Sequence, residues 1–293
     1  RGSLHRESFG GNTIMAETLG PEAVETYQRD GALHPVRAMP ADEAAALRQK
    51  LQAAEAAAGG KLEGGLKFKP HLLYPWLHDL VCDPRITGPV SEVLGDDVLC
   101  WASNFFTKEA NDPAYVSWHQ DSTYWGLSGP DVCTAWIALS PSTVASGCMR
   151  VVPGTHAEQI GHTDTHAEGN MLSRGQVVQA EVDDDAAVDV LLEPGEMSLH
   201  HVRLIHGSRA NTSNDRRIGY AIRYAAPHLH QLYSDEDSAT LVRGEDRYQH
   251  FAPEPRPASD LDPAALDRHR HLLEVHTKIL YRGTHGSLGT IPG

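Results

Sequence analysis

The stretch Trp118-His119-Gln120-Asp121-Ser122-Thr123-Tyr124-Trp125-Gly126 places a histidine and an aspartate two residues apart. Successive side chains of an extended strand point to opposite faces, so His119 and Asp121 project to one side while Gln120 points away. One imidazole and one carboxylate on the same face form two-thirds of the 2-His-1-carboxylate facial triad, whose open coordination positions suit non-haem Fe(II). The stretch therefore predicts a metal site that needs a second histidine.

The best candidate for this second histidine is His206, far downstream in the chain. It follows an apolar, strand-like run that begins at Leu204, and Gly207 comes directly after it. A glycine beside a ligand is typical of a place where another group closely approaches the backbone. The predicted iron ligands, which would also be the catalytic residues, are thus His119, Asp121 and His206.

Spacing alone leaves another interpretation open. A chain with 18 histidines contains chance His-x-Asp pairs, and one of them, His162 with Asp164, lies in a polar, glycine-containing stretch that predicts a loop. The alternative interpretation is that His119 and Asp121 form a polar surface pair and that His206 is a buried structural imidazole.

Three further motifs accompany the central stretch. They are Thr134-Ala135-Trp136-Ile137-Ala138-Leu139, Gly147-Cys148-Met149-Arg150-Val151-Val152-Pro153-Gly154-Thr155-His156, and the region from Gly195 to Ser208. Together with Trp118-His119-Gln120-Asp121 they resemble the phytanoyl-CoA dioxygenase family, which includes ectoine hydroxylases, over the region from Leu66 to Pro227. The resemblance implies a double-stranded β-helix and an oxygenase that uses Fe(II), O2 and 2-oxoglutarate.

The same resemblance implies further residues of the site. In the family an arginine falls eleven positions after the distal histidine, which selects Arg217 to bind the outer carboxylate of 2-oxoglutarate, because the guanidinium fork holds a carboxylate bidentately. By strand alternation Arg216 then points away. The other residues expected around the cosubstrate are Ser208, Asn104, Thr134 and Trp125, and those expected to face the substrate are Tyr124, Trp136, His201 and Lys108.

Composition restricts the class of protein. The 293 residues carry a formal net charge of −14, which argues against a nucleic-acid partner, and no apolar run is long enough to cross a membrane. The four cysteines form no Cys-x-x-Cys pair, so we expect reduced thiols and a cytoplasmic enzyme. The expected partner is a small-molecule substrate, and the expected assembly is a monomer or a homodimer.

The chain organisation predicts one oxygenase domain over residues 15–293, after a probable expression leader at 1–14. Prolines and glycines predict helices at 21–28, from Pro40 to Gly59, at 84–94 and at about 262–282. Between them, at about 98–226, short runs rich in β-branched and aromatic residues predict an all-β jelly-roll core with flanking helices. The expected strands are 98–107, 115–119, 133–140, 148–152, 176–182, 188–192, 196–200, 204–208 and 217–225.

The implied reaction is hydroxylation of an unactivated C–H bond of a metabolite, with decarboxylation of 2-oxoglutarate to succinate. Asp121 supplies the carboxylate ligand that halogenating relatives lack, so oxygenation is favoured over halogenation. Three alternatives stay open at this point: another oxidation at the same iron, such as desaturation, epoxidation or ring formation; a zinc hydrolase; and a jelly-roll protein that binds a ligand without catalysis.

Overall fold

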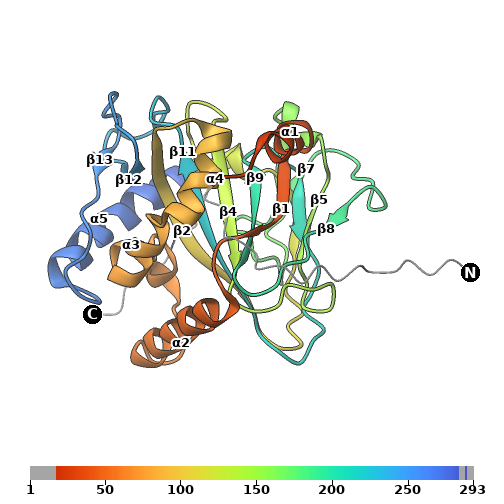
Figure 1. Cartoon of the computed structure of the whole chain (residues 1–293), viewed down its shortest axis with the longest axis horizontal. Helices are drawn as coiled ribbons and strands as arrows, with labels where there is room; N and C mark the ends of the chain where they lie inside the picture. The colour runs from red at the N-terminus through yellow and green to blue at the C-terminus, as the bar shows by residue number, and fades with distance from the viewer. Residues whose placement is uncertain (1–17, 284–287, 289–293) are drawn as a thin grey trace, which may run out of the picture.

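Two β-sheets face each other at the centre of the molecule as a double-stranded β-helix, as predicted (Figure 1). The structure, a computed structural model, describes residues 18–283 and residue 288. The leader predicted at 1–14 lies outside the described residues. In the larger sheet the strand order is β1-β9-β4-β11-β2-β12-β13, and in the smaller it is β3-β10-β5-β8.

The strands of the larger sheet are β1 (Ala32–Arg37), β2 (Val98–Lys108), β4 (Val132–Ala138), β9 (Glu196–His201), β11 (Arg217–Ala225), β12 (Ser238–Arg243) and β13 (Ala252–Pro253). Those of the smaller sheet are β3 (Val116–His119), β5 (Met149–Val151), β8 (Val188–Asp189) and β10 (His206–Ser208). A separate pair joins β6 (His162–Asp164) to β7 (Gln176–Val178). All these pairings are antiparallel except β12 with β13.

Helices cover the outer face of the larger sheet. They are α1 (Pro21–Asp30), α2 (Ala41–Ala57), α3 (Pro75–Val81) and α4 (Pro84–Leu94), and α5 (Pro263–Leu280) follows the last strand. Proline occupies the first position of α1, α3, α4 and α5. As expected, the Asp262 carboxylate caps α5 by accepting a hydrogen bond from Ala265 N. No helix among the described residues combines the length and the apolar character needed to cross a bilayer.

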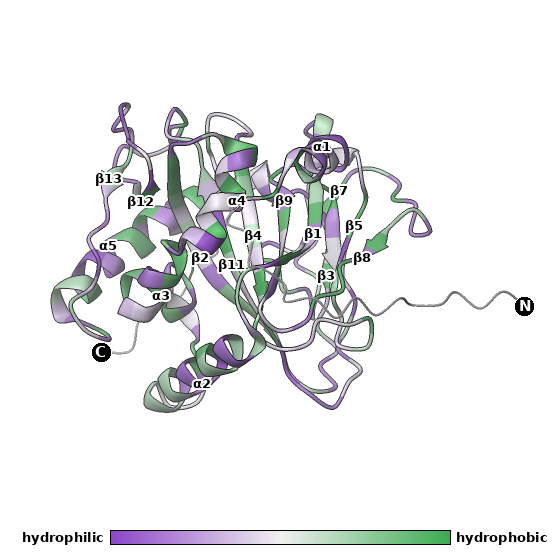
Figure 2. Ribbon diagram, in the orientation of Figure 1, coloured by the Kyte–Doolittle hydropathy of each residue, from purple (hydrophilic) through white to green (hydrophobic). Residues whose placement is uncertain are grey.

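Strand alternation divides the larger sheet into a packing face and a functional face. On β11, Ile218, Tyr220 and Ile222 belong to the apolar core beneath the helices, whereas Arg217 and Arg223 turn toward the smaller sheet and line a cavity. Figure 2 shows hydrophobic residues concentrated along the central strands, and a mixture of hydrophobic and hydrophilic residues along α2. The polar side chains on the inner face are therefore held by a rigid and well-packed sheet.

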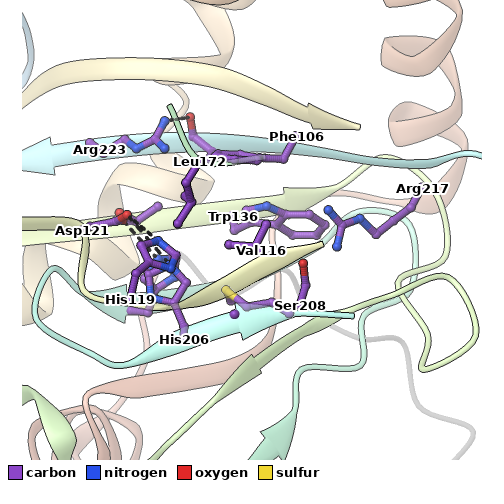
Figure 3. A pocket seen from close by; sticks show the side chains of 15 residues that line it. Phe106, Val116, His119, Asp121, Trp136, Leu172, His206, Ser208, Arg217 and Arg223 are labelled. Atoms are coloured by element: carbon purple, nitrogen blue, oxygen red, sulfur yellow. Dashed lines mark hydrogen bonds and ion pairs between the residues drawn. The ribbon is translucent and has the colours of Figure 1, made fainter. Parts of the chain in front are cut away.

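Gly219 leaves room for Trp136 on the inner face. The two residues lie on the neighbouring strands β11 and β4, and a Cβ built at Gly219 would lie 1.8 Å from Cζ2 of the indole. The absence of a side chain on β11 thus lets the indole lie flat across the sheet. This packing places Trp136 between Arg217 and the metal-binding residues (Figure 3).

We therefore expect Gly219→Ala to lower the free energy of unfolding by about 1–3 kcal/mol, the usual cost of overpacking. Chemical denaturation monitored by circular dichroism measures this loss. The double variant Gly219→Ala/Trp136→Leu is the control, because removing the indole should relieve most of the cost. If the glycine substitution costs the same in both backgrounds, the indole is not what requires Gly219.

The sequence-based prediction missed β1, α3, β12 and β13. Strand β1 contains a proline, α3 is short, and β12 and β13 fall in a charged tail that was expected to be mostly loop. The prediction of a loop at His162–Asp164 was wrong, because β6 pairs with β7 there. The polar or proline-containing segments β1, β6, β12 and β13 form strands because they pair with distant parts of the chain, which their local composition does not indicate.

Candidate active site

Two histidines and one aspartate from separate elements converge between the sheets (Figure 3). His119 ends β3, Asp121 begins a short 3-10 helix, η3 (Asp121–Tyr124), and His206 begins β10, directly opposite His119 in the smaller sheet. Nε2 of His119 lies 3.2 Å from Oδ1 of Asp121, and Nε2 of His206 lies 3.9 Å from the same oxygen. One ligand atom from each residue falls within 4.8 Å of the others, as one metal ion would require.

The local backbone explains why these side chains meet. Asp121 has left the strand, but Gln120 before it is extended, with φ −112° and ψ 135°, so the predicted alternation still places His119 and Asp121 on one side. The Gln120 amide points the other way and donates to the carbonyl of Arg203 at 2.6 Å. Gly207 lets β10 approach β3, because a Cβ there would lie 2.9 Å from the carbonyl oxygen of Val116.

Both imidazoles are held in the tautomer that suits a metal. Nδ1 of His119 donates to the carbonyl of Ser117 at 2.9 Å, and Nδ1 of His206 donates to that of Leu204 at 2.9 Å. When Nδ1 carries the proton, the lone pair of Nε2 is free to coordinate. Each backbone carbonyl therefore fixes both the orientation and the protonation of a candidate ligand.

The electrostatics of the cluster also favour a cation. Burial alone would raise the pKa of Asp121, but the imidazoles of His206, His119 and His200 hold the pKa of that carboxyl well below its usual range. Burial, together with His119, lowers the pKa of His206 well below its ordinary value, so its imidazole is neutral. An ionised carboxylate beside the neutral imidazole of His206 favours binding of a divalent metal.

Arg217 extends into the same cavity from β11. Its Nη1 donates to the carbonyl of Gly147, its guanidinium lies 5.4 Å from the centre of the Trp136 ring, and its buried Nε has no hydrogen-bond partner. Burial lowers its pKa to about 10, so the group stays charged at neutral pH. Arg216 points away as predicted and pairs with Glu55 at 2.7 Å. Arg217 thus has N–H donors available for an anion.

Ser208 lies beside this arginine and is held by a buried lysine. Nζ of Lys108 donates to Oγ of Ser208 at 2.8 Å, and burial lowers the pKa of Lys108 to about 7. Lys108 was expected to face the substrate from a loop. Instead, β2 continues through it and directs its amine behind Ser208, and it lines neither cavity of the site.

Two connected cavities meet at the metal-binding cluster. The inner one, of about 40 Å³, contains the three candidate ligands together with Thr134, Trp136, Ser208 and Arg217. The outer one, of about 410 Å³, is lined by Asn104 and Trp125 and reaches α5. Four residues border both cavities: Phe106, Asp121, Leu172 and Arg223. A small cosubstrate and a larger substrate would therefore approach Asp121 from different sides.

Two of the residues expected to face the substrate lie elsewhere. The Tyr124 hydroxyl donates to the carboxylate of Asp164, and His201 packs against His156 with ring centres 5.1 Å apart and ring planes tilted by 60°. Neither lines a cavity of the site. Strand β9 directs His200 inward instead, and its Nε2 lies 3.9 Å from Oδ2 of Asp121.

Known proteins resemble this chain in sequence and in structure. Residues 27–219, more than half of the 293-residue chain, match the phytanoyl-CoA dioxygenase family. The chain belongs to this family. A probable alpha-ketoglutarate-dependent hypophosphite dioxygenase of Stutzerimonas stutzeri is 31% identical over 168 residues, which are 55% of this chain and 58% of that protein. The chain spans about half the length of the curated relatives it matches.

Solved structures extend the similarity to most of the chain. The metal-free structure of the non-haem monooxygenase ThoJ is 35% identical and superposes with a TM-score of 0.76, covering 88% of this chain and 97% of that one. SnoK, a non-haem alpha-ketoglutarate-dependent carbocyclase, is 25% identical with a TM-score of 0.60, covering 86% of this chain and 98% of its own. The family resemblance and the double-stranded β-helix predicted from the sequence are thus confirmed.

Sequence reasoning missed three residues that border the site in this family member. Arg223 lies six positions after Arg217, so strand alternation places both on one face of β11, and this signal was available in the sequence. Phe106 and Leu172 carried no such signal. Leu172 comes from the segment between β6 and β7, where Arg174 anchors the chain by pairing with Asp164.

Proposed function

We propose that this protein is an Fe(II)- and 2-oxoglutarate-dependent dioxygenase that hydroxylates an unactivated C–H bond of a small-molecule metabolite. One observation carries the proposal: the Nε2 atoms of His119 and His206 and a carboxylate oxygen of Asp121 converge in the cavity that also contains the buried, incompletely hydrogen-bonded guanidinium of Arg217. Family membership and the printed names of the relatives, including alpha-ketoglutarate-dependent enzymes, support the same chemistry.

The donor set fits both groups. His119, Asp121 and His206 would hold Fe(II) as a facial triad that leaves coordination positions for a chelating cosubstrate and for dioxygen. Arg217 would bind the outer carboxylate of 2-oxoglutarate through its available N–H groups, with the Ser208 hydroxyl beside it. Bound iron supplies the redox chemistry: one atom of O2 enters the substrate and the other enters succinate as 2-oxoglutarate loses CO2.

The protein contributes position and shielding. Trp136 lies between Arg217 and the three ligands, and Phe106 and Leu172 cover the passage between the two cavities. These apolar groups exclude water from the oxidising centre and set the direction of substrate approach. The role of this chain is therefore to hold one C–H bond of the substrate against the metal.

Ring formation is the second candidate, because the carbocyclase SnoK superposes on most of this chain. The two outcomes differ in the product: hydroxylation adds one oxygen atom, whereas ring closure removes two hydrogen atoms. The zinc hydrolase and the non-catalytic binding protein do not account for Arg217, because neither needs a buried arginine with unused N–H donors in the same cavity as three metal ligands.

Oxygen consumption tests the proposal directly. The purified protein, loaded with Fe(II) and 2-oxoglutarate and offered a metabolite panel, should consume O2 and form succinate, with one panel member gaining an oxygen atom by mass spectrometry. A protein that forms no succinate with any member, or that converts a panel member with zinc in place of Fe(II) and without 2-oxoglutarate, contradicts the proposal.

Halide buffers test the role of Asp121 separately. Its carboxylate would occupy the coordination position that a chloride needs, so wild-type protein should give hydroxylated product or uncoupled succinate, and no halogenated product, in high chloride or bromide. Asp121→Gly should lose iron and activity rather than gain halogenation, because the substitution removes one of the three side chains that would hold the metal. A halogenated product from the wild type, detected by mass spectrometry, would overturn Asp121 as a ligand.

A further inference from the structure

Arg223 is a buried cation that forms no ion pair with any carboxylate among the described residues. Its side chain comes from the inner face of β11 and borders both cavities of the site. Nη1 makes one long hydrogen bond, 3.5 Å, to the carbonyl of Ala221, and the buried Nε has no partner. Arg216, which directly precedes β11 and points away from the cavity, is bound by Glu55 through two hydrogen bonds of 2.7 Å.

Two aromatic rings hold the guanidinium in place but leave its donors free. Its centre lies 5.5 Å from the ring centre of Phe106 and 5.6 Å from that of Trp125, which in turn packs on Trp101. Each cation–π contact contributes about 0.5–2 kcal/mol. The desolvation cost of an unpaired buried ion is several kcal/mol, so these rings offset only part of it. The two rings therefore orient the N–H groups of Arg223 but accept no hydrogen bonds from them.

When Fe(II) and 2-oxoglutarate are bound, the positive charge of Arg223 is not balanced by a negative charge in the site. The two positive charges of Fe(II) and that of Arg217 are balanced by Asp121 and the two carboxylates of 2-oxoglutarate. Arg223 adds a further positive charge that it cannot lose at neutral pH. A guanidinium fork matches a carboxylate bidentately, and the adjoining outer cavity, of about 410 Å³, has the volume of a small-molecule site.

We propose that Arg223 binds a carboxylate of the primary substrate, so that the substrate class is a small carboxylic acid that occupies the outer cavity. This inference rests on the proposed function, in which the inner cavity is taken by 2-oxoglutarate. The acid group would bind beside Asp121, and the rest of the molecule would lie along Trp125 toward α5. The carbon that is oxidised is then within a few bonds of the carboxylate.

Paired probes that differ only in charge test the proposal. Phenylacetate and hexanoate are titrated by calorimetry, each beside its primary amide, into protein loaded with Fe(II) and 2-oxoglutarate without oxygen. Wild-type protein should bind the carboxylates at least about tenfold more tightly than the amides, since a hydrogen bond to a charged group contributes about 1.5–3 kcal/mol. Arg223→Gln should abolish this preference, and Arg223→Lys should restore part of it.

The control is Arg209→Gln, which removes an exposed arginine outside both cavities and should leave the preference intact. Equal binding of acids and amides by the wild type, or a preserved preference in Arg223→Gln, would overturn the proposal. So would a loss of 2-oxoglutarate affinity in Arg223→Gln as large as in Arg217→Gln, which would place Arg223 in the cosubstrate site. Failure of the proposed function itself looks different: the wild type would bind no 2-oxoglutarate in the presence of Fe(II).

Discussion

Replacing His119, Asp121 or His206 by alanine is expected to lower the Fe(II) affinity of the protein by about 100-fold or more in each case. Replacing a residue that merely orients a ligand already costs about 10- to 100-fold, and each of these side chains would supply a ligand atom itself. The three atoms meet within 4.8 Å, so no remaining pair can complete the site. Anaerobic titration with Fe(II) gives the affinities, and circular dichroism verifies that each variant is folded.

A nearby histidine outside the site provides the matched control. His201 is on β9, next to the inward-facing His200, but packs against His156, so His201→Ala should bind Fe(II) as tightly as the wild type. The ligand assignment fails if two of the three triad variants keep the iron content of the wild type.

The second large effect is expected for the cosubstrate. Arg217→Ala should weaken 2-oxoglutarate binding by about 100-fold, because removing one partner of a buried charge pair costs roughly 3 kcal/mol or more. Arg217→Lys should recover only part of the loss, since an ammonium lacks the planar fork. Calorimetric titration of 2-oxoglutarate into the Fe(II)-loaded protein without oxygen gives both values.

Arg216→Ala is the matched comparison, because the Arg216 side chain points away from the cavity that Arg217 lines. It leaves Glu55 unpaired and should therefore lower the free energy of unfolding, yet leave the 2-oxoglutarate affinity near that of the wild type. Equal losses of affinity in Arg216→Ala and Arg217→Ala would mean that the cosubstrate is bound elsewhere.

Strand alternation predicted the parts of the site that depend on local geometry. It placed His119 and Asp121 on one side although η3 begins at Asp121, because the extended Gln120 preserves the direction. It also separated Arg217 from Arg216. The same rule, applied six residues further, reaches Arg223. Where one regular strand carries several polar residues, the sequence therefore contains most of the information about the site.

Side-chain directions that depend on long-range packing could not be predicted from the sequence. Strand β9 pairs with β1 and β4 along its two edges, and residues on both of its faces are buried. Nothing local therefore shows that His200 rather than His201 enters the site. Lys108 resembles the start of a loop, yet β11 pairs with it through Arg217 and extends β2 by one residue. Contacts between distant segments decide the direction of these side chains.

Titration of 2-oxoglutarate into the anaerobic protein, with and without one equivalent of Fe(II), tests the central claim most directly. If His119, Asp121 and His206 hold the metal and Arg217 holds the outer carboxylate, one molecule of 2-oxoglutarate binds per chain only when Fe(II) is present, and a visible charge-transfer band appears with it. Binding that is indifferent to Fe(II), or an iron-loaded protein that develops no such band, would contradict this account.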